Sequence, residues 1–386
     1  MNKLKVMVIF GTRPEAIKFA PLIRELQKNS DKIETIVTVT AQHREMLDQV
    51  LETFAIVPDY DLNIMKNNQS LTDTTVNAIK GLDVVIKSEQ PNLILVHGDT
   101  TTTFAASLAA FYNKVSIGHV ESGLRSWEKH SPYPEEVNRQ LTSIIADLHF
   151  APTKKAAENL IAENKNKDSI FVTGNTAIDT LKLTVSNEYN HPLFSKIGTD
   201  KLILLTTHRR ENFGGPMQNI FKAIKRIVSE NKNVQVVYPV HLNPHVKKTA
   251  YEILGCISKV HLIDPLGVRD FHNFMNKSYI VLTDSGGLQE EAPSLGVPVL
   301  VLRSTTERPE GIEAGALKLV GTEQNSIYTT TQKLLNDKKS YTSMVQTLNP
   351  YGDGKASERI VKAIKFHHRL TDEKPADFNP SLIYRS

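Results

Sequence analysis

Residues His97–Glu136 read HGDTTTTFAASLAAFYNKVSIGHVESGLRSWEKHSPYPEE, and this stretch decides the fold. The apolar run Leu93–Val96 stops abruptly before it, and four threonines then lead into an alanine-rich segment, which predicts a strand, a tight loop and a helix. A second strand is predicted over Val115–Val120. Asp99 and Glu121 therefore follow the carboxyl ends of two successive strands.

A third acid comes from the loop after the second strand. Prolines bound this loop, which delivers Glu135 and Glu136 at a helix start, with Pro134 suited to the first helical position. One of the pair can converge with Asp99 and Glu121 on the crevice outside the strand ends, where open α/β sheets bind ligands. The structural alternative is that Asp99 is only an N-cap and that Glu135 only interacts with the helix dipole.

A histidine precedes each strand-end acid by two residues. His97 stands before Asp99 and His119 before Glu121, and residues two apart on a strand face the same side. This joint pattern favours a functional site over two unrelated helix caps. A metal held by the same four side chains is the alternative; we predict no metal.

Strand-like runs alternate with helical patterns along almost the whole chain, which is typical of a doubly wound parallel sheet. The alternation restarts after the polar segment 186–200, so we predict an α/β protein with two Rossmann-like domains and a cleft between them. The predicted domains are residues 1–178, residues 179–356, and a C-terminal helix with a tail, residues 357–386, whose helix packs back on the first domain. The remaining predicted strands are Val6–Phe10, Glu34–Thr40, Leu148–Ala151, Ile170–Thr173, Leu202–Thr206, Val234–Val240, Val260–Ile263, Tyr279–Thr283 and Val297–Leu302.

Composition limits the classes of partner. The 386 residues carry a net charge of +4 without a block of consecutive like charges, so we expect no nucleic-acid partner. The single cysteine, Cys256, excludes an internal disulfide framework. The apolar run near the N-terminus is too short for a signal peptide and no stretch approaches membrane-spanning length, so we expect a cytoplasmic protein with no membrane partner.

Two loops have the character of anion sites. In the first, Arg13 and Lys18 lie at a predicted helix start, where backbone donors and two cations suit a diphosphate, although a solvated helix start is the alternative. The loop matches neither a P-loop nor a dinucleotide fingerprint, so we predict no cofactor. In the second, amides and a hydroxyl after the strand Tyr279–Thr283 can cradle a phosphate, and an acid one turn later can accept ribose hydroxyls. These residues are Ser285, Gly286, Gly287 and Glu291, with Arg308 downstream.

Histidines also follow strands in the second predicted domain. His208 and Arg209 end its first strand, where they suit a departing phosphate group, although a surface salt-bridge cluster is the alternative. His241 and His245 have helical spacing, but Pro244 interrupts a helix there and no glutamate follows His241, which argues against a zinc site.

Long motifs distributed over nearly the whole chain resemble the bacterial non-hydrolysing UDP-N-acetylglucosamine 2-epimerases. The motifs are GTRPEAIK, TAQHREML, HGDTTTT, GHVESGLR, SPYPEE, HRREN, TDSGGLQEEAPSLGVPVLVLR, TTERPE and YGDGKASERI. The resemblance implies a fold similar to the two-domain GT-B glycosyltransferases and glycogen phosphorylase. It also implies the substrate, UDP-GlcNAc, which such enzymes interconvert with UDP-ManNAc.

The implied chemistry explains the acids. The C2 proton of a sugar is not acidic, so inversion without a nicotinamide requires UDP to leave first, giving 2-acetamidoglucal, followed by reprotonation and return of UDP. A base, an acid and a cationic clamp are needed. The resemblance assigns Asp99, Glu121 and Glu135 to acid and base roles and His208 to UDP departure. Crowded carboxylates raise one another's pKa, which allows one to remain protonated.

Family positions also imply ligand contacts. Those for UDP fall on Arg13, Lys18, His208, Phe271, Ser285, Gly286, Gly287, Glu291 and Arg308, while Leu266 replaces a frequent Gln. Many relatives bind a second, activating UDP-GlcNAc through residues that align with Gln42, His43, Glu135, Arg209 and His241. Here Glu45 replaces a usual Gln and Asn68 a usual Arg, so we predict weakened or altered activation.

Other functions remain open on the sequence alone. A GT-B glycosyltransferase would need an acceptor surface, a hydrolysing epimerase would release free ManNAc and UDP, and a non-catalytic UDP-sugar sensor would be expected to have lost one of the acids or His208. By resemblance, the expected partner is a small nucleotide sugar, the expected assembly is a homodimer that closes over substrate, and the expected role is supply of ManNAc for teichoic acid, capsule or another surface polysaccharide.

Overall fold

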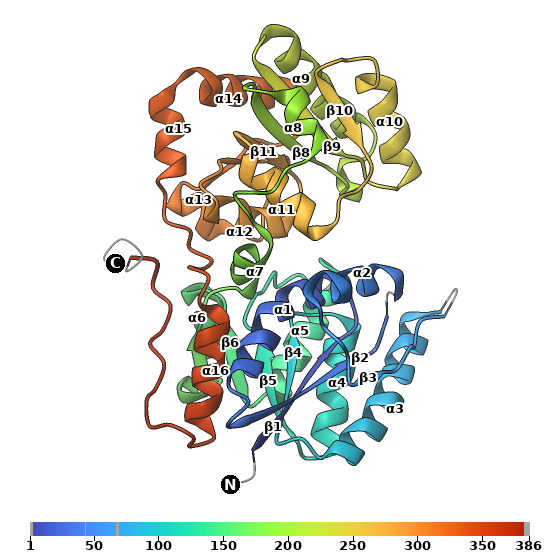
Figure 1. Cartoon of the computed structure of the whole chain (residues 1–386), viewed down its shortest axis with the longest axis vertical. Helices are drawn as coiled ribbons and strands as arrows, with labels where there is room; N and C mark the ends of the chain where they lie inside the picture. The colour runs from blue at the N-terminus through green and yellow to red at the C-terminus, as the bar shows by residue number, and fades with distance from the viewer. Residues whose placement is uncertain (1–2, 43, 67–68, 382–386) are drawn as a thin grey trace. The chain divides into compact units, whose positions relative to one another are not determined.

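The computed structural model describes residues 3–42, 44–66 and 69–381, and the chain forms two compact units (Figure 1). The first unit consists of the chain up to Leu183 together with Tyr351–Asn379, and the second includes Thr184–Pro350. The backbone therefore passes from one unit to the other after Leu183 and returns at Tyr351.

The first unit is built on a seven-stranded, fully parallel sheet of order β3-β2-β1-β4-β5-β6-β7. Its strands are rich in Val, Ile and Leu that are buried on both faces, as expected where helices cover a parallel sheet. They are β1 (Leu4–Phe10), β2 (Ile33–Val39), β3 (Tyr60–Asp61), β4 (Leu93–His97), β5 (Ser116–Val120), β6 (Leu148–Ala151) and β7 (Ile170–Val172).

Several helices of the first unit begin at residues whose side chains cap them. Ser70, Thr100 and Thr153 each accept a hydrogen bond from a backbone N–H of the first turn. Helices α3, α4 and α5 pack side by side, and the C-terminal α16 lies beside α1 (Figure 1). The helices are α1 (Arg13–Lys28), α2 (Arg44–Phe54), α3 (Leu71–Glu89), α4 (Thr101–Tyr112), α5 (Glu135–Ile145), α6 (Lys154–Ala162), η1 (Lys167–Ser169), α7 (Thr176–Thr184, whose last residue is grouped with the second unit) and α16 (Ala356–His367).

The second unit has a six-stranded parallel sheet of order β10-β9-β8-β11-β12-β13. Its strands are β8 (Lys201–Thr206), β9 (Val234–Pro239), β10 (Val260–Ile263), β11 (Ile280–Thr283), β12 (Val299–Val301) and β13 (Leu317–Leu319). Its helices are α8 (Pro192–Ile197), η2 (Arg210–Asn212), α9 (Gly215–Glu230), α10 (Pro244–Leu254), α11 (Val268–Lys277), α12 (Gly286–Ser294), α13 (Pro309–Ala314), α14 (Gln324–Asn336) and α15 (Lys338–Val345). One apolar core joins α9, α10 and α14 to the sheet.

The predicted α/β class with two parallel sheets is confirmed, and every predicted strand is present to within two residues at each end. Two short strands, β3 (YD) and β13 (LKL), were not predicted, because neither forms a continuous apolar run. In both sheets the strand order reverses at the first strand of the unit, between β1 and β4 and between β8 and β11. Such reversal points open a crevice at the carboxyl ends of the strands.

Candidate functional site

The reversal point of the first sheet is built around Gly11, which follows β1. A Cβ there would lie 2.1 Å from Thr40 Oγ1 and 2.4 Å from Thr102 Oγ1, and those two hydroxyls are themselves 2.8 Å apart. The loop therefore passes against the loop after β2 and the first turn of α4 with no room for a side chain. This approach fixes the start of α1, which carries Arg13 and Lys18.

A buried carboxylate holds the same loop from inside. Glu15 Oε2 accepts hydrogen bonds from the N–H groups of Gly11 and Thr12 at 3.0 and 2.8 Å. Its Oε1 accepts from Thr100 Oγ1 at 2.6 Å and Thr103 Oγ1 at 3.1 Å. Burial raises the pKa of Glu15, and these hydrogen bonds oppose that rise. Glu15 thus joins the loops after β1 and β4.

Glu121 lies where β5 ends and is surrounded by donors. Its Oε2 forms an ion pair with Lys18 and accepts a hydrogen bond from Asn175 Nδ2 at 2.9 Å, and His97 Nε2 lies 3.8 Å away. The backbone of Glu121 has φ = 60°, an uncommon conformation for a residue other than glycine. The structure therefore brings together two predicted site residues, Lys18 and Glu121.

Asp99 lies beside this cluster in the loop after β4. It forms an ion pair with Arg139 of α5, and Asn138 Nδ2 donates to its backbone oxygen at 3.0 Å. Burial raises the pKa of Asp99, Arg139 opposes the rise and the charge of Glu121 adds to it. The N-cap of α4 is Thr100, not Asp99, so the capping alternative for Asp99 does not apply.

The two glutamates at the start of α5 have different environments. Glu136 is fully buried and accepts from the N–H groups of Ser126 and Trp127 at 3.0 and 3.2 Å, so it holds the preceding loop. Burial works to raise its pKa, but these donors, together with Gln140 and Arg139, outweigh burial and the pKa lies below its usual value. Glu135 is half-buried and its side chain makes no hydrogen bond or ion pair with another described residue, which leaves its carboxylate available to a ligand. Pro134 occupies the N-cap position, one residue before the predicted one.

Three buried histidines stand on neighbouring strands beneath the acids. His119 Nε2 donates to Gly98 O at 2.7 Å, and its Nδ1 has no hydrogen-bond partner in the described part of the chain. His149 Nδ1 lies 3.1 Å from Ser122 Oγ. Burial lowers the pKa to about 4 for His97 and to about 3 for His119 and His149. All three are neutral at pH 7 and serve as hydrogen-bonding and packing groups.

In the second unit, the reversal point centres on Asp284 after β11. Its Oδ2 accepts from the N–H groups of His208 and Arg209, each at 2.9 Å, and from Asn212 Nδ2 at 3.0 Å. His208 Nδ1 lies 3.1 Å from Asp284 Oδ1. Burial works to raise the pKa of Asp284, but His208 and the amides outweigh it and hold the pKa at about 2. Asp284 therefore stays ionised and orients His208.

The glycine-rich loop that follows begins α12. A Cβ on Gly286 would meet the guanidinium of Arg308 at 3.7 Å, so that cation lies directly over the first turn of the helix. Arg308 Nε donates to Glu290 Oε1 at 2.5 Å, and this buried acid anchors it. Free amides at a helix start beside an arginine form an anion-binding arrangement. Ser285 is the N-cap residue, and its side chain makes no capping hydrogen bond.

Glu291 and Phe271 lie on the two helices nearest this loop. Glu291 Oε2 is 3.7 Å from His272 Nε2, and His272 Nδ1 lies 2.7 Å from Thr184 Oγ1. Phe271 precedes His272 on α11 and is partly exposed. Leu266 lies in the loop between β10 and α11.

The residues aligned with a second ligand site are placed in both units. Gln42 Oε1 accepts from Thr102 Oγ1 at 3.1 Å in the first unit. In the second, the rings of His208 and His241 stack with centroids 5.5 Å apart, and the buried Nε of Arg209 makes no hydrogen bond among the described residues. His43 and Asn68, and the side chain of Glu45, lie outside the described part of the structure.

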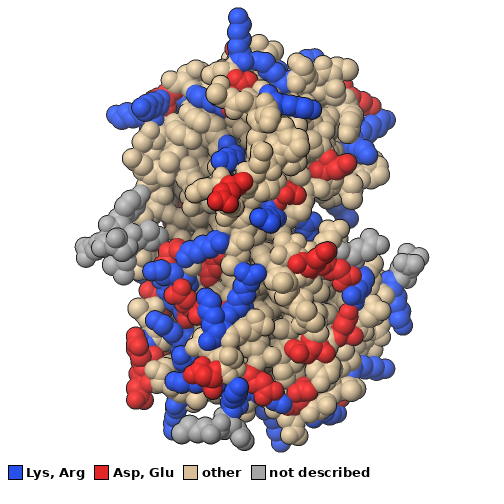
Figure 2. Space-filling view, viewed as in Figure 1, with Lys and Arg blue, Asp and Glu red and all other residues tan. Residues whose placement is uncertain are grey.

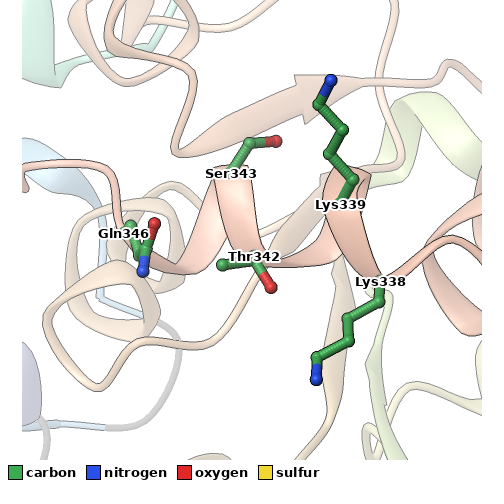
Figure 3. Close-up of a pocket in the computed structure, with 5 residues that line it drawn as sticks. All are labelled: Lys338, Lys339, Thr342, Ser343 and Gln346. Carbon is green, nitrogen blue, oxygen red and sulfur yellow. The ribbon is translucent and has the colours of Figure 1, made fainter.

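Four further features bear on other kinds of site. Within the described ranges, no group of three His, Cys, Asp or Glu residues is arranged to hold a metal, and no helix is long and apolar enough to cross a membrane. Basic and acidic side chains are interspersed on the visible face (Figure 2). A cavity of about 510 Å³ borders α15, but Lys338 and Lys339 point to opposite sides of that helix rather than toward a common point (Figure 3).

Two parallel α/β units, one with a carboxylate cluster and one with a glycine-rich anion loop at its reversal point, define a two-domain α/β protein of GT-B-like fold. A family model for UDP-N-acetylglucosamine 2-epimerase matches residues 24–365, and the chain belongs to that family.

Individual relatives support this family membership. The chain is 62% identical to the UDP-N-acetylglucosamine 2-epimerase of Bacillus subtilis, over 98% of this chain and 99% of that protein. Among solved structures it is similar to S. aureus MnaA solved with UDP, with 55% identity, a TM-score of 0.91 and coverage of 98% and 100% of the two chains. The Neisseria meningitidis UDP-GlcNAc 2-epimerase bound to UDP-GlcNAc is 49% identical with a TM-score of 0.85, covering 93% and 99%.

Sequence reasoning missed the residues that hold the predicted ones. Asn175 and Arg139 bind the carboxylates of Glu121 and Asp99, and Asp284 orients His208. Arg139 was detectable in principle, since it lies one helical turn after Glu135. Asn175 was not, because it follows a different strand and its contact with Glu121 depends on the order of strands in the sheet.

Proposed function

We propose that this protein interconverts UDP-GlcNAc and UDP-ManNAc by eliminating UDP and adding it back on 2-acetamidoglucal. Family membership supports the substrate, and the cluster of Asp99, Glu121 and Lys18 supports the chemistry. That cluster is the observation that carries the proposal, because it offers both a protonatable acid and an ionised carboxylate at one crevice.

The two carboxylates suit different steps. In the first step the bond from C1 to the UDP oxygen breaks, the C2 proton passes to a carboxylate and a C1=C2 double bond forms. Glu121, paired with Lys18, suits the ionised base. In the second step a proton is added to C2 from the other face and UDP returns to C1. Asp99, whose pKa burial raises, suits the proton donor. Glu135, whose side chain has no hydrogen-bond or ion-pair partner among the described residues, is the third candidate for proton transfer.

The second unit supplies the groups for UDP. The amides of Gly286 and Gly287 and the guanidinium of Arg308 suit the diphosphate, and Glu291 suits the ribose hydroxyls. His208, oriented by Asp284, suits hydrogen bonding to the departing phosphate. In this scheme the side chains of the two units supply both the proton transfers and the UDP contacts, without a nicotinamide or a metal.

Proton NMR of the purified protein with UDP-GlcNAc in deuterated water tests the proposal. We expect UDP-ManNAc to appear with deuterium at C2 without added cofactor. Accumulation of UDP and free sugar would instead identify a hydrolase. Binding of UDP-GlcNAc without any turnover would indicate a glycosyltransferase that lacks its acceptor, or a sensor, and would contradict the proposal.

We also propose that the protein is a homodimer and that its product feeds a surface polysaccharide. Large apolar side chains, each more than half exposed, stand on three helices that pack side by side: Val84 of α3, Phe111 and Tyr112 of α4, and Ile144 of α5. An exposed apolar surface of this kind is typical of an interface. Light scattering after gel filtration gives the mass directly, and a monomer at micromolar concentration would contradict the dimer.

A further inference from the structure

The loop after β7 presents one side chain, Asn175, to the carboxylate of Glu121. Asn175 Oδ1 accepts a hydrogen bond from the N–H of Ala177 at 3.0 Å, which identifies the other amide atom as the nitrogen. That nitrogen, Nδ2, donates to Glu121 Oε2 at 2.9 Å. The orientation of the amide is therefore fixed by its own helix start, and the donor faces the acid.

The backbone of Asn175 is held by a segment distant in sequence. Its N–H donates to Tyr351 O at 2.7 Å, at the point where the chain re-enters the first unit. The preceding Gly174 has φ = 83°, and a Cβ on it would lie 3.3 Å from Gly352 Cα. Two glycines thus allow the two backbones to approach closely, and Asn175 has little freedom to move away from Glu121.

We propose that Asn175 is a positioning residue for the reaction: its carboxamide fixes the orientation and the negative charge of the Glu121 carboxylate. This inference rests on the proposed function, in which Glu121 transfers a proton at C2. The amide acts together with Lys18, which pairs with the same oxygen. Because Asn175 donates from the β7 side and Lys18 from α1, the two donors approach the carboxylate from different elements.

Several other groups influence the charge of Glu121. His97 and His119, beneath it, are neutral at pH 7, since burial lowers the pKa of each. Asp99 lies near enough for the two acids to interact, and this repulsion favours protonation of one of them. A neutral hydrogen-bond donor at residue 175 opposes that repulsion, whereas a second negative charge there would strengthen it.

The substitution Asn175→Asp tests this role with little change in shape. Aspartate retains an acceptor for the N–H of Ala177 and leaves the backbone bond to Tyr351 intact, but it replaces the donor facing Glu121 with a carboxylate oxygen. We expect kcat to fall about tenfold or more with little change in KM. We also expect one limb of the pH profile of kcat to move up by about one pH unit, whichever limb Glu121 controls.

NMR of protein labelled at glutamate Cδ follows the titration of Glu121 independently of turnover, with Glu121→Gln identifying its signal. The titration midpoint should rise in Asn175→Asp. If Asn175→Asp does not fold, Asn175→Ser takes its place. Serine keeps an acceptor for the N–H of Ala177, but it cannot reach Glu121 and adds no charge. A lower kcat and a raised titration midpoint of Glu121 are then expected. Asn166→Asp, an exposed change in the same unit, is the matched control and should behave as the wild type.

The outcomes separate this inference from the proposed function. A wild-type protein that does not epimerise contradicts the function. A wild type that epimerises, with a variant whose kcat stays within about twofold, or whose kcat falls without movement of the pH limb and the Glu121 midpoint, overturns the role of Asn175.

Discussion

The imidazole of His208 is held by Asp284, whose Oδ1 lies 3.1 Å from His208 Nδ1 while Oδ2 accepts three N–H donors from the loop after β8. One buried carboxylate thus fixes the orientation of the His208 ring and the conformation of the loop that carries it. Because the pKa of Asp284 is held at about 2, the group stays ionised throughout the physiological range.

Removing this charge should cost both activity and stability. Asp284→Asn replaces a carboxylate that accepts several N–H groups with a neutral amide, one end of which is itself a donor. We therefore expect kcat to fall about 100-fold and the free energy of unfolding to fall by about 3 kcal/mol. Steady-state kinetics and urea unfolding measure the two effects. Asp168→Asn, an exposed change on η1, is the control. Wild-type kcat in Asp284→Asn would show that His208 needs no such support.

Acid should destabilise the protein through the histidines beneath the first site. His97, His119 and His149 have pKa values of about 4, 3 and 3 when folded, and about 6.5 when unfolded. The unfolded state therefore binds more protons as the pH falls below 6.5, and stability decreases toward pH 4 by up to about 4 kcal/mol per pH unit. Urea unfolding between pH 5 and 7 measures the slope. In His149→Gln the slope of the unfolding free energy against pH should decrease by about one third. An unchanged slope would show that the buried histidines do not cause the acid sensitivity.

The close approach at Gly11 should not tolerate a methyl group. We expect Gly11→Ala to lower stability by about 2 kcal/mol and to weaken UDP binding, because a Cβ would overlap two threonine hydroxyls and displace the start of α1. Calorimetry of melting and of UDP binding tests both effects. Gly215→Ala is the matched control, since a Cβ at this helix start meets nothing within 4 Å. Equal behaviour of the two variants would contradict the prediction.

A methyl group at Gly286 should weaken UDP binding without the loss of stability expected for Gly11→Ala. A Cβ there meets only the Arg308 guanidinium at 3.7 Å, an ordinary contact, so the fold should be retained. The methyl would occupy space where we propose that phosphate oxygens lie, and the Kd for UDP should rise about tenfold or more. Titration calorimetry measures the Kd and melting controls for the fold. Tight UDP binding by Gly286→Ala would place the diphosphate elsewhere.

Activation by a second UDP-GlcNAc should be weak. The family pattern has an arginine where Asn68 stands, and loss of a cation weakens a diphosphate contact. We expect a nearly hyperbolic rate curve against UDP-GlcNAc and turnover of UDP-ManNAc alone, with sigmoidicity increased in Asn68→Arg. Strong sigmoidicity in the wild type, together with no UDP-ManNAc turnover until UDP-GlcNAc is added, would contradict the prediction.

The parallel sheets could be predicted because their buried strands are continuous apolar runs in the sequence. The acids at the strand ends could be predicted because they end those runs. Local patterns also predicted that Gly286 and Gly287 begin a helix after a strand, as they do. They could not identify Asn175, Asp284 or Glu15 as holding groups, because each acts on a neighbouring loop whose proximity is set by strand order. The distinction between Glu135 and Glu136 likewise required burial, since Glu136 fixes the preceding loop and the Glu135 side chain has no partner within the described ranges.

The return of the chain at Tyr351 has a consequence for synthesis. The N–H groups of Ala356 and Ser357, at the start of α16, are capped by the buried carboxylate of Asp179 at 3.0 and 2.6 Å, so α16 completes the first unit. On the ribosome, residues up to Leu183 emerge early but must wait for the whole second unit before Asn175 and Asp179 meet their partners. The order of translation therefore makes the backbone contact between Asn175 and Tyr351, and the cap of α16 by Asp179, the contacts of the first unit that form late.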